Sequence, residues 1–559
     1  MPKALLPSRA RFHSFVPLSQ FSQPPVLTFT ITAISVTQRP FSSLRQERPR
    51  QQETPVKYLR MERDYQTALR LLNSLQSNFA VTSLFKPEPS ASNEPKRDLN
   101  AQAIPEMLHW LRRAGYTPED LIPLKTIHIA GTKGKGSVTA FCTSMLLRFP
   151  AAGLVGTYTS PHIVSVRERI MLDGKPISRE LFTKYFFELW DKFEASALEA
   201  GERDVEGPAS KPFYFRYLTI MAWHVFLREG VKSMVMECGI GGEYDATNVI
   251  PRQAVTAAVV TKLGIDHVAM LGDTVDKIAW HKSGIFRPGV KAFLLAPQEE
   301  QAVHKVRERA VEKGADLIEV HDQLANDPLL TQARLQGPYV SHNMTLALYA
   351  VREHLGILGE HISFGQDGVP TELAMALQST SLRGRSEVFV DDQNNLEWYL
   401  DGAHTHDSLE GVSQWWTTEL AKGARDMTRT CLLFNQQERD TGRLLTAVAN
   451  STRHGLQESD DRLNAHLFDL AVFSRNELEL VDGKPAGDLL VQLEACKTMR
   501  QLDRRTLAVS QSSVRAAVDV IRNYATVAQG DGHACKVLVT GSFHLVGAVL
   551  RCIDPNVEE

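Results

Sequence analysis

A glycine- and lysine-rich segment, GTKGKGS, follows the apolar run TIHIA and precedes the helix-like stretch SVTAF. Glycines let a backbone fold tightly around an anion, a helix N-terminus adds partial positive charge, and Lys135 adds a full charge. The strict pattern G-x-x-x-x-G-K-[ST] is not met, because Ile129 replaces the first glycine and Gly136 follows the lysine. A turn that only caps the helix through Ser137 is the alternative. The strand–loop–helix context favours a phosphate site made by Gly131, Thr132, Lys133, Gly134, Lys135, Gly136 and Ser137.

A carboxylate stands at the end of another apolar run, KSMVMECG, where Glu237 precedes a cysteine and a glycine. Open α/β sheets place ligands at the carboxyl ends of their strands. Magnesium prefers hard oxygen ligands and takes one or two protein carboxylates in phosphoryl-transfer sites. Glu237 is therefore a candidate metal ligand beside the phosphate loop.

These residues need a sheet to position them, and the sequence predicts two. Short β-branched runs alternate with helical stretches from about residue 100 onward, and the same rhythm resumes after residue 388. We expect an α/β fold with a phosphate-loop-containing doubly wound sheet in residues 61–382 and a smaller Rossmann-like α/β domain in residues 383–559. Three polar stretches are expected to be surface loops: KPEPSASNEPKRD, GERDVEGPASKP and TRHGLQESDDRLNAH.

Composition narrows the classes of function. The 559 residues include 62 Lys and Arg against 65 Asp and Glu, a formal net charge of -3. This balance, with no basic stripe carrying interleaved aromatics, argues against nucleic acid as a partner. The six cysteines lie far apart without metal-like spacing, and no apolar stretch reaches about 18 residues, so neither a zinc site nor a transmembrane segment is expected.

Residues 1–60 differ from the rest of the chain. They hold nine basic residues, and the first acidic residue is Glu47. An Arg-rich, Ser-rich, acid-poor segment is typical of a mitochondrial transit peptide, although a disordered tail with no address has a similar composition. Met61 directly precedes the first helical pattern, so translation from Met61 would give a cytoplasmic form.

Nine blocks, in this order, resemble the eukaryotic folylpolyglutamate synthase family: GTKGKGS, TYTSPHIVSVRERI, PFYFRYLTIMAWHVF, MECGIGGEYDATNV, TKLGIDHVAMLGDT, IAWHKSGI, LRGRSE, DGAHT and VLVTGSFHLVG. The resemblance covers roughly residues 61–555. It implies a Mur-ligase-like ATP-dependent ligase that adds L-glutamate to the γ-carboxyl of a folate through an acyl phosphate, giving ADP and phosphate. It also implies ATP, Mg²⁺ and a monovalent cation such as K⁺ as cofactors, a monomeric chain, and reduced folate and glutamate as substrates.

The resemblance also implies a metal site. Ser160, Glu237 and His267 would position the magnesium that bridges the ATP phosphates. Lys282 corresponds to a lysine that some relatives carry as a carbamate, which would serve a second magnesium. His281 stands here where bacterial members usually have Glu, so a solvated helix lysine is the alternative reading of Lys282.

Two further residues are assigned to ATP by the resemblance, Arg385 and Asp401. An arginine fork can brace phosphate oxygens, and a carboxylate can accept from ribose hydroxyls. His404 is expected near the transferring phosphoryl group, and with Lys135 and Lys282 it forms the expected catalytic set. Thr405 departs from the Asn of many bacterial relatives, and simple linker charges are the alternative for Arg385 and its neighbour Arg383.

Two other functions remain open from the sequence. Dihydrofolate synthase shares the fold and mechanism but joins glutamate to dihydropteroate. Phe215 and Arg216 match the Phe-Arg of eukaryotic folylpolyglutamate synthases rather than the Phe-Glu of dihydrofolate synthases. A nucleotide-gated binding protein that has lost catalysis is the alternative from another class, and glutamate-dependent ADP release would separate it from a ligase.

Overall fold

The computed structural model describes residues 62–75, 99–324, 333–337, 339–363, 368–422, 427–437, 440–459, 466–479 and 488–557. These residues all belong to one compact unit, Glu62–Glu559. The predicted transit peptide, Met61 and the whole of the first predicted loop lie outside the described residues.

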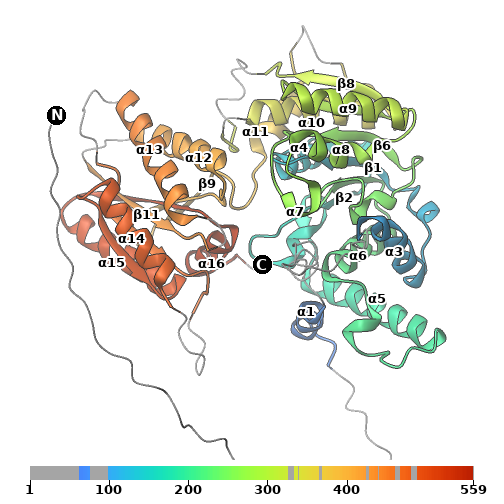
Figure 1. Cartoon of the computed structure of the whole chain (residues 1–559), viewed down its shortest axis with the longest axis horizontal. Coiled ribbons are helices and arrows are strands. Elements are labelled where there is room, and N and C mark those ends of the chain that lie inside the picture. Colours follow the sequence, from blue (N-terminus) through green and yellow to red (C-terminus); the bar gives the residue numbers. More distant parts are fainter. Residues whose placement is uncertain are drawn as a thin grey trace, which may run out of the picture. The chain divides into compact units, whose positions relative to one another are not determined.

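The first sheet, of which β1, β2, β6 and β8 are labelled in Figure 1, has the strand order β4-β3-β2-β5-β1-β6-β7-β8. The six strands from β2 to β8 in that order are parallel, and β3 and β4 pair antiparallel at one edge. Their bounds are β1 Lys125–Ala130, β2 Val155–Tyr158, β3 Ile170–Leu172, β4 Lys175–Pro176, β5 Ser233–Glu237, β6 Val255–Val260, β7 Lys291–Ala296 and β8 Asp316–His321.

Helices cover both faces of this sheet because its central strands are apolar on both sides. Val235 packs with α4, α10 and α11, whereas Met234 and Met236 pack with the helices of the other face. The bounds are α1 Tyr65–Ser74, α3 Leu99–Arg113, α4 Lys135–Leu146, α5 Arg179–Glu199, α6 Tyr214–Glu229, α7 Val268–Leu271, α8 Val275–Lys282, α9 Glu300–Lys313, α10 Val340–Ile357 and α11 Thr371–Ser379. Short 3-10 turns are η1 Pro118–Leu121, η2 Pro150–Ala152, η3 Val166–Arg169, η4 Pro208–Ser210, η5 Ala246–Val249 and η6 Ser283–Ile285.

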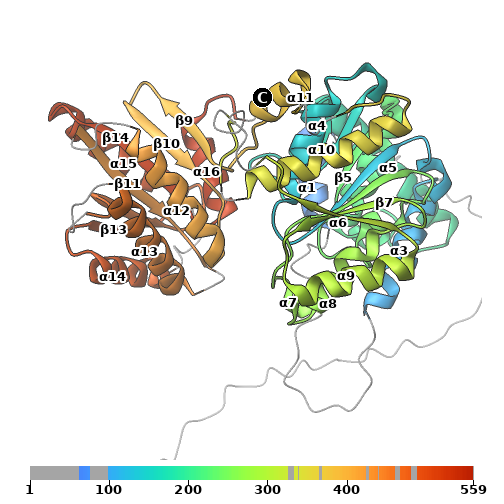
Figure 2. The same cartoon turned by 90° about the horizontal axis from the view of Figure 1, so that it is seen from above.

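The second sheet has six strands in the order β13-β12-β11-β14-β10-β9, and only β9 is antiparallel to its neighbour. The strands are β9 Glu387–Asp391, β10 Leu396–Leu400, β11 Thr428–Phe434, β12 Leu470–Ser474, β13 Leu507–Gln511 and β14 Ala534–Thr540. One face is covered by α12 His406–Ala421, α13 Thr441–Ser459 and α14 Leu490–Leu502, the other by α15 Val514–Gly530 and α16 Phe543–Ile553 (Figure 2).

Two parallel-dominated sheets, each between two layers of helices, confirm the predicted α/β fold class. The predicted domain boundary at residues 382 and 383 falls between α11 and β9 and stays a prediction. None of the described helices combines the length and apolar character needed to span a bilayer.

Candidate active site

The predicted phosphate loop joins β1 to α4, and two of its glycines have backbone conformations that favour glycine. Gly131 has a φ of 149° and Gly134, the cap of α4, has a φ of 91°. A Cβ on Gly131 would lie 1.8 Å from the Thr261 hydroxyl oxygen, and one on Gly134 would lie 2.5 Å from Oδ1 of Asn343. The sharp entry into α4 therefore depends on both glycines.

Part of this loop is held by the protein itself. The N–H groups of Thr132 and Lys133 donate to the Lys262 carbonyl at 2.9 and 3.1 Å, and the Thr261 hydroxyl donates to the Lys133 carbonyl at 2.7 Å. These two N–H groups are thus engaged rather than directed at an anion. The first turn of α4, with Lys135, Gly136 and Ser137, carries the helix N–H groups that have no intrahelical acceptor and can face a phosphate.

Two lysines converge on one carbonyl of this loop. Nζ of Lys135 donates to the Gly131 carbonyl at 3.0 Å, and Nζ of Lys282 donates to the same oxygen at 2.8 Å. Lys282 lies at the end of α8 and is buried. Burial, and next the charge of Lys135, lowers the pKa of Lys282 to about 7. A neutral amine is therefore well populated at this position near neutral pH.

Glu237 ends β5, the strand that pairs with β1, and its side chain is only 2% exposed. Its Oε2 accepts a hydrogen bond from the Thr159 hydroxyl and one from the Ser160 N–H at 3.3 Å. Burial raises the pKa of this carboxyl, and the charge of Lys135 opposes the shift. A Cβ on Gly136 would lie 3.8 Å from Oε2, so the carboxylate lies beside the first turn of α4.

This arrangement fits a divalent cation. A buried carboxylate next to the N–H groups that would receive a phosphate would repel that phosphate, and a hard cation between the two removes the repulsion. Both hydrogen bonds that Glu237 accepts from described residues fall on Oε2, so Oε1 is available as a ligand atom. Ser160, another predicted magnesium ligand, lies next to this carboxylate, because its backbone N–H donates to Glu237.

His267 lies on the loop after β6, where it caps α7 with a left-handed backbone, φ 49°. Its side chain is 44% exposed, and its Nε2 lies 3.9 Å from Oδ2 of Asp266. The same loop contacts the phosphate loop, because the Thr132 hydroxyl donates to the Gly264 carbonyl at 3.0 Å. The structure therefore brings this loop to the phosphate loop, while the role of His267 as a metal ligand stays a prediction.

The remaining predicted residues lie around the carboxyl end of β10. Asp401 is buried and accepts from the N–H groups of Ser386 at 2.8 Å and Ala403 at 2.9 Å. Burial raises its pKa, and the nearby Arg385 charge opposes the shift. His404 Nδ1 lies 3.0 Å from the Gly402 carbonyl oxygen.

Phe543 also lies at the carboxyl end of β10, and no role was predicted for it from the sequence. The Arg385 guanidinium carbon lies 4.3 Å from the centroid of the Phe543 ring, and the His404 ring lies 5.5 Å from it. Phe543 stands in the block VLVTGSFHLVG, but a single aromatic next to apolar residues gives no signal that separates it from a core residue.

Charged side chains of the second sheet interact with charged side chains of the first sheet. Burial raises the pKa of both Glu237 and Asp401, and the Arg385 charge opposes the shift in each, so its guanidinium acts on both carboxylates. Nζ of Lys133 forms an ion pair with Oδ2 of Asp407 at 2.8 Å. The predicted residues of both sheets therefore belong to one charged region.

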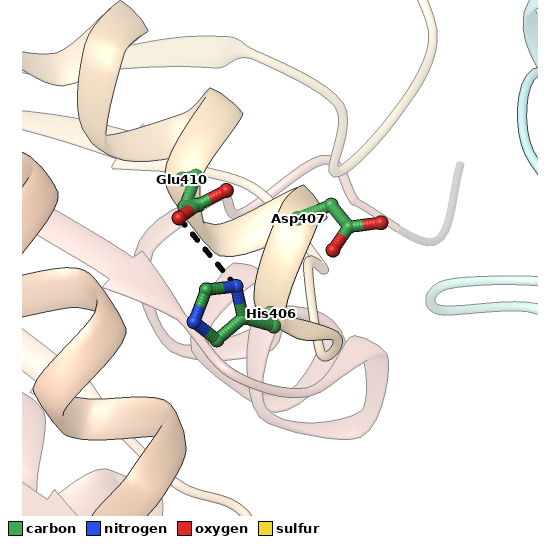
Figure 3. Close-up of side chains that lie close together, drawn as sticks. All are labelled: His406, Asp407 and Glu410. Carbon is green, nitrogen blue, oxygen red and sulfur yellow. Dashed lines mark ion pairs between the residues drawn. The ribbon is translucent and has the colours of Figure 1, made fainter.

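Asp407 is also one of three possible metal-ligating side chains in the first two turns of α12, with His406 and Glu410 (Figure 3). His406 pairs with Glu410 at 3.5 Å, and both are exposed or partly exposed. The Lys133 ammonium already supplies Asp407 with a cation. We assign no metal to this cluster.

Arg216, the residue that separated the two candidate synthases in sequence, lies in the first turn of α6. Its Nη1 pairs with Oε1 of Glu106 at 2.5 Å, and its guanidinium lies 5.7 Å from the Phe213 ring centroid. The neighbouring Phe215 ring packs against Gly239, two residues after Glu237. The Phe-Arg pair thus lies next to the β5 loop, and its arginine is neutralised by an acidic partner.

A glycine-rich loop after the first strand of a parallel sheet, a buried carboxylate on the adjacent strand and a second, smaller α/β sheet define a Mur-ligase-like two-sheet protein. Solved structures have the same fold. The chain aligns to Mycobacterium tuberculosis folylpolyglutamate synthase complexed with ADP with a TM-score of 0.63 and 22% identity, covering 88% of this chain and 98% of that chain. It aligns to E. coli FolC in complex with DHPP and ADP with a TM-score of 0.57 and 22% identity, covering 86% and 99%.

Sequence comparison gives the family. Folylpolyglutamate synthase of Neurospora crassa is 38% identical over 88% of this chain and 92% of its own length, and that of Candida albicans is 36% identical over 90% and 98%. No family model matches the chain. The chain belongs to the folylpolyglutamate synthase family, a family of ligases.

Proposed function

We propose that this protein adds L-glutamate to the γ-carboxyl of reduced folates and their polyglutamate tails, with ATP converted to ADP and phosphate. The observation that carries the proposal is the arrangement of Lys135, Glu237 and the first turn of α4 at adjacent strand ends. Family membership supports the same activity.

The chemistry requires activation of a carboxylate. An oxygen of the folate γ-carboxylate attacks the γ-phosphorus of ATP, the bond from phosphorus to the β,γ-bridging oxygen breaks, and ADP leaves. The amine of glutamate then attacks the acyl carbon, loses a proton and displaces phosphate to leave an amide. Each step gathers negative charge, and we propose that the Lys135 ammonium and the α4 N–H groups stabilise it.

We propose Ser160, Glu237 and His267 as the residues that would hold magnesium. When bound there, the ion would neutralise charge on the phosphate oxygens. Glu237 supports this assignment because its carboxylate is buried beside α4. The proposed monovalent cation, K⁺, rests on the family resemblance alone.

Lys282 supports a carbamate in one respect. A carbamate forms when a neutral amine attacks carbon dioxide and a proton is released, and burial favours the neutral form of Lys282. The carbamate nitrogen keeps one N–H, which can continue to donate to the Gly131 carbonyl. Lys135 lies close enough to favour the new negative charge.

Arg385 and Asp401 are proposed to bind ATP, and His404 to lie near the transferred phosphoryl group. Their gathering at one end of β10 supports this, since the Arg385 charge acts on both Asp401 and Glu237. A site built from two sheets can also exclude water from an acyl phosphate.

The test is an assay of the purified chain with ATP, labelled glutamate and either tetrahydrofolate or dihydropteroate. We expect glutamate incorporation with tetrahydrofolate and equimolar ADP, abolished by removal of divalent cations with EDTA. Incorporation only with dihydropteroate would make the protein a dihydrofolate synthase. ADP release that does not depend on glutamate would contradict the ligase function.

We also propose that the full chain is mitochondrial and that a form initiated at Met61 is cytoplasmic. We further propose that the catalytic chain is a monomer. The basic, acid-poor composition of residues 1–60 supports the targeting. Fluorescent fusions of the full chain and of the chain from Met61 would test it. Mitochondrial fluorescence from both fusions would contradict the assignment of residues 1–60.

A further inference from the structure

Phe543 is a large apolar residue whose ring is not used in the core. It opens α16 directly after β14 and is partly exposed. Leu545 and Val546 of the same helix are fully buried in the cluster formed with α15 and the sheet, which does not include Phe543 among the described residues. Some other contact must account for the position of this ring.

The ring contacts segments that carry proposed nucleotide-binding residues. Arg385 lies over its face at 4.3 Å, and His404 meets it edge-to-face at an interplanar angle of 61°. Gly402 fits closely against it, because a Cβ there would lie 2.2 Å from the Phe543 Cδ1. A single ring therefore packs against Gly402 and His404 after β10 and against Arg385 before β9.

The face contact has a specific consequence for Arg385. An arginine whose charge acts on two buried carboxylates, Glu237 and Asp401, can be drawn into an ion pair that uses up its donors. The face of an aromatic ring attracts the flat face of a guanidinium, and this contact uses none of the N–H donors of the arginine. The edge of the guanidinium, with its donors, remains available for phosphate oxygens.

We propose that Phe543 is a positioning residue for the nucleotide, holding the guanidinium of Arg385 and the imidazole of His404 in place. This inference rests on the proposed function, since it takes Arg385 and His404 as residues that meet ATP. Phe543 itself need not touch the substrate.

The test compares three variants of the full chain: Phe543→Leu, Phe543→Tyr and Phe389→Leu. Phe389 is a control, because it is a partly buried phenylalanine of β9 that packs on the core cluster from which Phe543 is absent. We expect Phe543→Leu to weaken ADP binding, measured by calorimetry, about tenfold. Phe543→Tyr keeps the ring and should bind within threefold of the wild type. Phe389→Leu should lower the melting temperature without changing ADP binding.

A double-mutant cycle with Arg385→Ala identifies the route of the effect. If Phe543 acts chiefly through Arg385, Phe543→Leu should weaken ADP binding less than threefold further in the Arg385→Ala background. Full additivity, or equal ADP affinity in Phe543→Leu and wild type, would overturn the proposal. Glutamate incorporation by the wild type is measured in parallel; its absence would reject the proposed function, while the ADP-binding results would still decide the role of Phe543.

Discussion

The two sheets contribute differently built halves to the candidate site. At the first sheet, Glu237 and Lys282 are each 2% exposed, whereas Lys135 is partly exposed. At the second sheet, Asp401 is buried and held by two backbone N–H groups, but Arg385 and His404 are partly exposed beside an aromatic ring. The first half therefore holds one carboxylate and one amine in a low-dielectric environment, and the second half presents the Arg385 guanidinium nearer to water.

This difference indicates a division of labour. Burial raises the pKa of Glu237 and lowers that of Lys282, so each group departs from its ordinary behaviour in water. Electrostatic interactions with a transferring phosphoryl group are strongest where water is excluded. We expect residues of the first half to control mainly the rate of the chemical step, and residues of the second half to control mainly nucleotide affinity.

The largest effect should come from the first half. Lys135→Ala or Glu237→Ala should lower kcat for glutamate addition at least about 1000-fold, because each removes a charge next to the transferred phosphoryl group. Lys133→Ala is the control on the same loop, since the Lys133 ammonium is paired with Asp407. We expect a loss of less than about tenfold for Lys133→Ala in the same steady-state assay. A similar loss for all three variants would remove the distinction between the two lysines.

An intermediate effect is expected at Asp401. Asp401→Asn replaces one acceptor oxygen by an NH2 group, which would face a backbone N–H and could not accept its hydrogen bond. The KM for ATP should therefore rise about tenfold, with a smaller change in kcat. Asp391→Asn is the control, because Asp391 is a buried aspartate of β9 that accepts from Arg522 at 3.1 Å. Asp391→Asn should lower the melting temperature and leave the KM for ATP unchanged. A change confined to kcat in Asp401→Asn would contradict the division of labour.

The smallest effect on activity, but a clear one on stability, is expected at His354 on α10. Burial lowers its pKa to about 4, and its ring bonds to the hydroxyls of Thr256 and Ser233 at 2.8 and 2.9 Å. Between pH 6.5 and 4, His354 binds a proton in the unfolded state but not in the folded state. Its contribution to the free energy of unfolding is therefore fully present above pH 6.5 and is lost as the pH falls through that window. The linked loss is about 3 kcal/mol by pH 4.

His354→Gln should reduce this part of the pH dependence, measured as the free energy of urea unfolding at pH 4.5 and 7. It should be less stable than the wild type at pH 7, with a smaller further loss at pH 4.5. An unchanged difference between the two pH values would show that another group is responsible. Activity at pH 7 should change little, because His354 contacts residues at the start of β5 and β6, whereas the predicted phosphate loop follows the last residue of the parallel strand β1.

The central strands of both sheets could be predicted from sequence, because strands buried on both faces form continuous apolar runs. Edge strands such as β8 and β13 were missed, since their exposed positions break that pattern. The polar stretch TRHGLQESDDRLNAH was predicted as a loop, but α13 continues through it to Ser459. Its buried Thr452 and Leu456 lie one helical turn apart and carry the packing that stabilises this part of the helix.

The candidate site shows a similar limit. Lys135 and Glu237 follow or end apolar runs, so their place at strand ends could be predicted. The hydrogen bonds from the Thr132 and Lys133 N–H groups to the Lys262 carbonyl could not be predicted, because they depend on how two loops pack against each other. The contact between Phe543 and Arg385 depends in the same way on the fold of the second sheet.

The central claim, that an acyl phosphate forms at this site, is tested most directly by oxygen transfer. A folate substrate labelled with ¹⁸O in its γ-carboxylate is incubated with the protein, ATP and glutamate, and the released phosphate is analysed by mass spectrometry. The account predicts one ¹⁸O atom in each phosphate, because the carboxylate oxygen that attacks ATP leaves with phosphorus when the amide forms. Phosphate without ¹⁸O, released together with glutamylated product, would contradict it.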